Sequence, residues 1–158
     1  MIRRQKFLLI ACAALTLIIA GITWVWLRPH DPIPTDIRQS ANFSLYYPTK
    51  LPKDLMLDKG SFSYGNKVVA FVVKSGDKKI FVTEQAKPAD FNFEQFYQDK
   101  LDESTEFTTT YGKAASGTVN QNTRVVSLVT NGTWVFLNTM SDVSFDQLEV
   151  ITKALVKS

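Results

Sequence analysis

Residues 123–139 read TRVVSLVTNGTWVFLNT and contain the strongest hairpin signal in the chain. Thr123–Thr130 and Thr133–Thr139 are both rich in β-branched and aromatic residues, which favour strands. Between them lies Asn131-Gly132, the pair most typical of a two-residue turn, because both turn positions require a positive φ. This stretch therefore predicts two neighbouring antiparallel strands.

The segments before this hairpin also have the patterns of strands. Lys67–Lys74 reads KVVAFVVK, an almost continuous apolar run that predicts a central, well-covered strand. Lys79–Glu84 returns after a turn at residues 75–77, so these two segments form a meander. Further strands are predicted at Phe43–Tyr47, Ser61–Tyr64, Thr105–Tyr111 and Gly117–Asn120.

Two segments have the spacing of helices. In the first, apolar residues recur at helical intervals from Phe93 to Leu101, with Asn92 or Asp90 placed to cap the first turn. In the last, Ser144 and Gln147 form a capping box. The apolar face of this last helix is predicted to consist of Phe145, Leu148, Ile151 and Leu155.

The N-terminal region is one uninterrupted apolar run over residues 7–27, FLLIACAALTLIIAGITWVWL. A helix of this length is about 31 Å long, which matches the hydrocarbon thickness of a bilayer. The flanking cations are mostly on the N-terminal side, so the N-terminus is expected inside the cell and the rest outside. The residues that flank this membrane anchor are Arg3, Arg4, Lys6, Trp24, Trp26 and Arg28.

Other interpretations of the same run stay open. A cleaved secretory signal has a shorter apolar core and a small-residue cleavage site, whereas this run ends in Trp-Val-Trp-Leu. Cys12 is preceded by Leu-Ile-Ala as in lipoproteins, but most of the apolar run follows it. Small residues at Cys12, Thr16, Ala20 and Thr23 share one helix face, which either packs on another helix or faces lipid.

The chain divides into an N-terminal cytoplasmic end (1–6), a transmembrane helix (7–27), a proline-containing extended spacer (28–40) and an extracytoplasmic domain (41–158). The predicted fold class is α+β: the N-terminal transmembrane helix is followed by one antiparallel sheet of about five to seven strands, with two helices packed on one face. The expected location is the plasma membrane, crossed once.

Charge and composition exclude several functions. Residues 1–30 contain four Lys or Arg and no acid, whereas residues 31–158 contain fourteen Lys or Arg and fifteen Asp or Glu. The outer domain therefore lacks the positive charge that nucleic-acid binding requires. The only histidine, His30, lies in the spacer and the only cysteine, Cys12, lies in the apolar run. We therefore expect no metal, no cofactor and no Ser or Cys catalytic triad.

Two weaker catalytic patterns remain. Asp99, Asp102, Glu103 and Glu106 provide the paired carboxylates of a glycosidase, although a solvated surface explains them more simply. Lys113 and Ser116 have the residue types of a Lys-Ser dyad, but their surroundings are typical of a turn.

The domain resembles a group of bacterial envelope proteins. The opening FSLYYPTKLPKDL, the middle hairpins, Trp134 and the ending SFDQLEVITKALVKS are similar to small extracytoplasmic domains that follow a single membrane helix. These include the outer parts of anti-sigma-factor-like regulators, and the layout is similar to the α/β sandwich of the photosystem II extrinsic oxygen-evolving protein. The resemblance implies a non-catalytic, partner-binding or scaffold role and assigns no functional residue.

Three functions follow as hypotheses. The favoured one is a membrane-anchored, non-catalytic interaction or scaffold module that contacts lipid through residues 7–27 and binds a protein of the cell envelope. The first alternative is a carrier or sensor of a small apolar ligand, which requires a cavity lined by apolar side chains. The second is a cell-wall-modifying enzyme, which requires two carboxylates in a cleft, at least one with a strongly shifted pKa.

Overall fold

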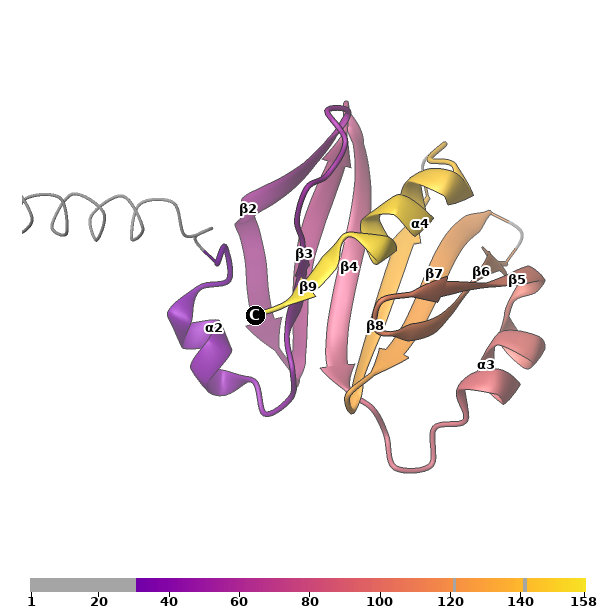
Figure 1. The fold of residues 1–158 in the computed structure, drawn as a ribbon, viewed down its shortest axis with the longest axis horizontal. Helices are drawn as coiled ribbons and strands as arrows, with labels where there is room; N and C mark the ends of the chain where they lie inside the picture. The colour runs from indigo at the N-terminus through magenta and orange to yellow at the C-terminus, as the bar shows by residue number, and fades with distance from the viewer. Residues whose placement is uncertain (1–30, 121, 141) are drawn as a thin grey trace, which may run out of the picture. The chain divides into compact units, whose positions relative to one another are not determined.

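The computed structural model describes residues 31–120, 122–140 and 142–158, of which Pro32–Ser158 belong to one compact unit. The main sheet of this unit consists of β2 (Leu55–Gly65), β3 (Val68–Ser75), β4 (Lys78–Ala86), β5 (Asp102–Thr109), β6 (Gly112–Val119), β7 (Thr123–Thr130) and β8 (Thr133–Thr139). Its strand order is β2-β3-β4-β8-β7-β6-β5, and every neighbouring pair is antiparallel (Figure 1). The first and second halves of the sheet therefore meet between β4 and β8.

The predicted hairpin at the centre of the sheet is confirmed. β7 and β8 have the expected bounds, and Thr130 pairs with Thr133 across the turn. Asn131 and Gly132 have φ values of 45° and 76°, as a two-residue turn of this kind requires. The outermost strands are less regular, because the pairing shifts between Asp58 and Ser63 in β2 and between Asp102 and Thr105 in β5.

One face of the sheet, which we name the front face, carries the main core. α4 (Phe145–Lys153) lies across it (Figure 1). Leu148 and Ile151 of α4 are fully buried against sheet residues such as Leu128, Val135 and Leu137. The predicted capping box of this helix is confirmed, since Gln147 N donates to Ser144 Oγ at 3.2 Å and Ser144 N donates to Gln147 Oε1 at 3.3 Å.

A two-stranded ribbon forms a second layer on the front face. It pairs β1 (Tyr46–Pro48) with β9 (Leu155–Lys157) in antiparallel fashion. Tyr46 and Leu155 belong to the same core as α4, so the ribbon extends the cover of the sheet. Beside it, the short helix α2 (Thr35–Ser40) buries Ile37 in a second cluster that includes Tyr47.

The opposite, back face is covered by α3 (Phe93–Lys100). Tyr97 and the following Leu101 are buried against Ala115 and Val125. Successive side chains of a strand point to opposite faces. Ala114 and Val126, the neighbours of these two sheet residues, belong to the core under α4, so α3 and α4 lie on opposite sides of the sheet.

The predicted fold class is wrong. The described residues are mostly strand, with a seven-stranded sheet, a separate two-stranded ribbon and three short helices that cover both faces. Leu155 belongs to β9 and not to the last helix, because the chain leaves the helix after Lys153. Residues 35–40 form α2 and not an extended spacer, because Ile33 and Ile37 bury their side chains there.

The predicted central, well-covered strand corresponds to β3, which is well covered on one face only. Val69, Phe71 and Val73 are buried on the front face, whereas Val68, Ala70 and Val72 are only partly buried on the back. On the neighbouring strand, the ring of Phe81 is 46% exposed. The cause is the position of α3, whose buried contacts in the sheet are on the β6 and β7 side.

The predicted membrane location needs a correction. Across the part of the chain that the structure describes, no helix has the length and apolar character needed to cross a bilayer. The predicted span 7–27 lies outside the described residues, and so do the flanking residues (Arg3, Arg4, Lys6, Trp24, Trp26 and Arg28) and the small-residue face (Cys12, Thr16, Ala20 and Thr23). The membrane location is therefore not carried into the functional conclusions.

The close approach of β6 to the end of α3 gives the first prediction. A Cβ atom at Gly117 would lie 2.9 Å from Leu101 Cβ and 3.0 Å from the carbonyl oxygen of Asp102. Gly117→Ala should therefore lower the free energy of unfolding by about 1–3 kcal/mol through overpacking, measured by urea denaturation. Gly65→Ala is the matched control, because nothing lies within 4 Å of its Cβ position. Equal effects of the two substitutions would contradict the packing argument.

Candidate functional site

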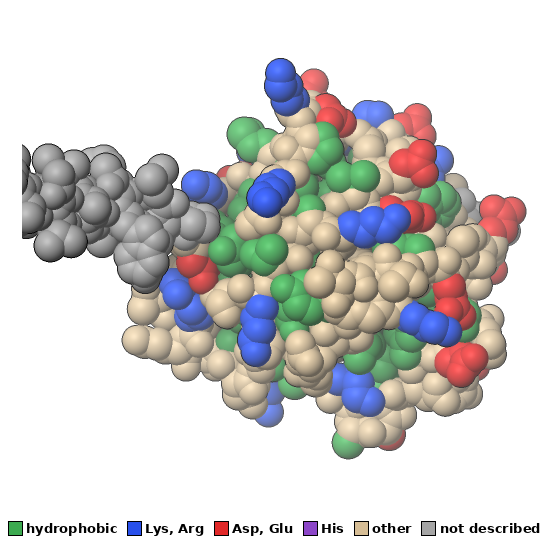
Figure 2. All heavy atoms as spheres, in the orientation of Figure 1, with side chains coloured by type: hydrophobic (Ala, Val, Ile, Leu, Met, Phe, Trp, Pro, Cys, Tyr) green, Lys and Arg blue, Asp and Glu red, His purple; other side chains and the backbone are tan. Residues whose placement is uncertain are grey.

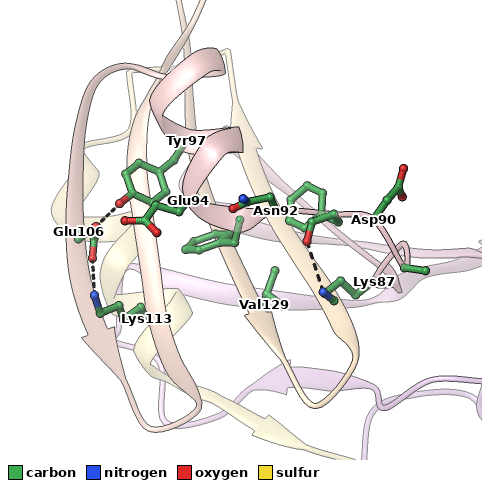
Figure 3. Close-up of a pocket in the computed structure, with 11 residues that line it drawn as sticks. Lys87, Asp90, Asn92, Glu94, Tyr97, Glu106, Lys113 and Val129 are labelled. Carbon is green, nitrogen blue, oxygen red and sulfur yellow. Dashed lines mark hydrogen bonds and ion pairs between the residues drawn. The ribbon is translucent and has the colours of Figure 1, made fainter.

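The main candidate site is a cleft of about 530 Å³ on the back face. It lies between the loop of residues 87–92, the first turns of α3, and the β5–β6 hairpin (Figure 3). Its ionisable lining residues are Lys87, Asp90, Glu94, Tyr97, Glu106 and Lys113. Phe91 and Phe93 add aromatic surface to the same lining.

The loop on one side of the cleft is held in place by hydrogen bonds within the loop and to the β7–β8 turn. Lys87 N donates to the carbonyl oxygen of Gly132 at 2.7 Å, and Phe91 N donates to that of Pro88 at 3.1 Å. Lys87 Nζ also donates to the carbonyl oxygen of Phe91 at 3.3 Å, as Figure 3 shows. Asn92 then caps α3, because its Oδ1 accepts from Gln95 N at 3.1 Å.

An aromatic cluster supports this loop from the sheet side. The rings of Phe91 and Trp134 have centroids 4.4 Å apart, and Phe96 contacts Trp134 edge-on at 5.3 Å. Trp134 Nε1 donates to Ser127 Oγ at 2.8 Å, which satisfies its polar group within the sheet. The position of the loop is therefore determined by β7 and β8.

Three side chains on the opposite wall form a hydrogen-bonded chain. The hydroxyl of Tyr97 donates to one carboxylate oxygen of Glu106, and Lys113 Nζ lies 3.2 Å from the other (Figure 3). The hydrogen bond from Tyr97, followed by that from Lys113, lowers the pKa of Glu106. The same bond, followed by burial and the charges of Glu106 and Glu94, raises the pKa of Tyr97 to about 12. At neutral pH Glu106 is therefore ionised and Tyr97 is protonated.

The charge of the cleft and its surroundings is negative. Residues 87–113 contain six Asp or Glu and three Lys. Within the described part of the chain, Glu94 and Asp90 make no ion pair, whereas Glu106 has Lys113. Figure 2 shows acidic side chains along the right-hand margin of the domain, where Figure 1 places α3 and β5.

The structure separates most of the carboxylates that make up the weak glycosidase pattern in the sequence. Of the four carboxylates proposed as glycosidase partners, only Glu106 lines the cleft, whereas Asp99 lines a neighbouring hollow. Glu103 is exposed, and its φ of 53° lies within the irregular start of β5. Asp102 is exposed on the same strand. These residues do not form a catalytic pair.

The predicted Lys113 and Ser116 dyad is not formed. The two residues are three apart on β6, so their side chains point to opposite faces of the sheet. Ser116 Oγ donates to the carbonyl oxygen of Thr105 at 3.3 Å, and Lys113 contacts Glu106 instead.

Among the charged residues of the cleft lining, sequence reasoning missed Lys87 and Glu94, and it also missed the aromatic Phe91. Lys87 follows β4, and nothing in its local pattern indicates that the loop folds back over it. Glu94 was detectable in part, because the Asn92 cap places it in the first turn of α3. The pairing of Glu106 with Lys113 depends on the register of the β5–β6 hairpin, in which Glu106 lies opposite Ala115.

A second unusual carboxyl group lies away from the cleft. Glu84 on β4 is fully buried on the front face beneath β1. Burial raises its pKa to about 8, and the hydrogen bond from Tyr46 N only partly opposes this effect. Since the cleft is on the back face, Glu84 does not contribute to it.

Neither a search for metal-binding groups nor a comparison with known proteins identifies a further site. Among the described residues no three His, Cys, Asp or Glu side chains are grouped so as to hold a metal ion, and His30 and Cys12 lie outside those residues. No protein-family model, curated protein or solved structure matches the chain. The resemblance to anti-sigma-factor-like outer domains and to the photosystem II extrinsic protein therefore stays a prediction.

The hydrogen-bonded chain gives the second prediction. Tyr97→Phe removes the largest influence on Glu106, so the pKa of Glu106 should rise towards its ordinary value. Lys113→Met should also raise it, because it removes both a hydrogen bond and the nearby positive charge. Both shifts are measured by NMR titration of the carboxyl carbons. A pKa of Glu106 that stays unchanged in Tyr97→Phe would contradict the prediction.

Proposed function

We propose that this domain is a non-catalytic binding module, whose cleft holds a lysine or arginine side chain of a partner protein. The observation that carries the proposal is Glu94, a carboxylate on the cleft lining without a cationic partner among the described residues. A basic side chain that enters the cleft would provide the missing charge. Charge complementarity of this kind contributes to both specificity and association rate.

The rest of the lining favours the same occupant. The rings of Phe91 and Phe93 line the cleft next to the carboxylates, and aromatic rings attract cations through their negative faces. Glu106 is ionised and held in place by Tyr97 and Lys113, so it adds negative charge without needing to move. A cationic side chain would therefore contact groups that are already positioned for it.

Two observations favour binding over the wall-modifying enzyme. A glycosidase needs a carboxylic acid that remains protonated until it donates its proton. In the cleft the pKa of Glu106 is lowered, which is the opposite of what an acid catalyst needs. The carboxyl group whose pKa is raised, Glu84, is buried on the other face of the sheet.

The lining also argues against a carrier of a small apolar ligand. Such ligands bind in cavities with mostly apolar walls. Here five charged side chains contribute to the walls of the cleft. The neighbouring hollow near Phe96 likewise contains Asp90, Asp99 and Lys100.

The test is site-specific photocrosslinking of the full chain in the cells that produce it. A photoreactive amino acid at Ala89, an exposed residue of the cleft lining, should give a discrete protein adduct. Glu94→Lys should reduce the yield of that adduct at least fivefold, because it reverses the charge that receives the partner. The readout is gel mobility followed by mass spectrometry of the adduct.

Two controls make this test specific. The same photoreactive residue at Lys59, on the outermost strand β2, should not give this adduct. Asp77→Lys, in the exposed β3–β4 turn, should leave the yield unchanged. An adduct that forms equally at Ala89 and Lys59, or that is insensitive to Glu94→Lys, would overturn the proposal.

A further inference from the structure

The buried carboxyl group of Glu84 contacts the β1–β9 ribbon at the first residue of β1. Its residue exposure is 0%, and both of its oxygens lie within hydrogen-bond distance of Tyr46 N, at 3.2 and 3.1 Å. Tyr46 is the first residue of β1, whose other partner is β9. Among the described residues, the donor to this carboxyl group is therefore a single backbone N–H, which belongs to the ribbon and not to the main sheet.

The elements packed around Glu84 present no charge to it. Its neighbours on the adjacent strands β3 and β8 are Val69 and Val135. From β1, the titratable group is the phenol of Tyr46, whose oxygen accepts from Asn131 Nδ2 at 3.0 Å. Beyond it lies the phenol of Tyr111, in edge-on contact with the ring of Tyr46. No charged side chain of the described residues contributes to the pKa of Glu84.

Two further hydrogen bonds that join this region to the sheet and its turns are made by uncharged groups. Thr133 Oγ1 donates to the carbonyl oxygen of Ser44 at 2.7 Å. Lys157 N donates to the hydroxyl of Tyr111 at 3.1 Å. Among the hydrogen bonds described, the one from Tyr46 N to Glu84 is the bond whose acceptor changes charge.

Ionisation of Glu84 would leave a charge in an apolar core with one N–H as its partner. Such a charge is strongly unfavourable, and the nearest relief is water. Because β1 lies over the carboxyl group, water reaches Glu84 when the ribbon moves away. The sheet itself, with its seven paired strands, does not need to open.

We propose that the β1–β9 ribbon is a pH-sensitive cover, which lies on the front face while the Glu84 carboxyl group is neutral and lifts when that group is ionised. This inference concerns the face opposite the cleft and does not depend on the proposed function. Lifting exposes the apolar front face around Val69 and Val135 and frees the C-terminal end of the chain.

The sign of the pH dependence follows from the two states. With the ribbon closed the pKa of Glu84 is about 8, and with the ribbon lifted it is near the ordinary 4.5. The proton therefore stabilises the closed state fully below pH 4.5, and this stabilisation is lost as the pH rises to about 8. Between these values each pH unit raises the opening equilibrium about tenfold, and above pH 8 the equilibrium stays constant.

The test is amide hydrogen exchange of the full chain at pH 6 and pH 9, corrected for the intrinsic exchange rate. Protection of the ribbon amides, in residues 46–48 and 155–157, should fall about a hundredfold between these pH values. At both pH values the ribbon should be less protected than the central strands β7 and β8, because it opens without them. Protection of the ribbon equal to that of β7 and β8 at pH 9 would show that Glu84 ionises only through global unfolding and would overturn the proposal.

Two variants separate ionisation from other effects of pH. Glu84→Gln keeps a side chain that accepts from Tyr46 N but does not ionise, so the fall in ribbon protection should disappear. Glu103→Gln, an exposed residue of β5, should retain the fall seen in the unchanged chain. Ribbon exchange that still depends on pH in Glu84→Gln would overturn the proposal.

A measurement on the unchanged chain covers the case in which Glu84→Gln does not fold. NMR titration of ¹³C-labelled glutamate carboxyl groups should show one group with a midpoint well above the others. The loss of ribbon protection should follow the same midpoint. If every glutamate titrates below about pH 6, or if ribbon exchange follows a different midpoint, the proposal is wrong.

Discussion

The register of the β7–β8 hairpin is the constraint on which the rest of the domain depends. It points Val126 and Leu128 to the front face, under α4, and Val125 and Ser127 to the back. A shift by one residue would exchange these two sets, because strand side chains alternate between faces. Since the two faces carry different covers, the shift would bury Ser127 under α4 and turn core residues towards α3. The short Asn131-Gly132 turn prevents it by permitting one pairing.

The candidate site and the ribbon both follow from this register. On the back face, Trp134 is positioned to bond Ser127 and to support Phe91, which fixes the loop beside the cleft. On the front face, Val135 lies opposite Glu84 on the neighbouring strand β4. The cleft and the contact of Glu84 with the ribbon are therefore supported by consecutive residues of β8, one on each face of the sheet. A rigid strand at this position keeps both features in place while leaving them independent.

The sequence predicted local elements better than their arrangement. The Asn131-Gly132 hairpin and the Ser144 capping box were predictable because their signals are local and depend on few residues. The placement of the helices on opposite faces was not, because it depends on the tertiary contacts of Leu148 and Tyr97 with the sheet, which no local pattern indicates. The cleft could not be predicted from the sequence either, because a loop, a helix and a hairpin form its walls through tertiary contacts. The sequence predicts Glu84 only as the last residue of a strand. Its burial depends on the position of β1 above it, which the local pattern does not indicate.

The two irregular outer strands have a consequence for the behaviour of the protein in concentrated solution. An open sheet ends in strands with unpaired backbone groups, onto which a strand of another molecule can be added. Here β2 and β5 both break their regular pairing, between Asp58 and Ser63 and between Asp102 and Thr105. A bulge twists such a strand locally, so that a long flat template is not presented. The open seven-stranded sheet is partly apolar on its back face. Its edge strands nevertheless do not offer a regular template for strand pairing between two copies of the domain.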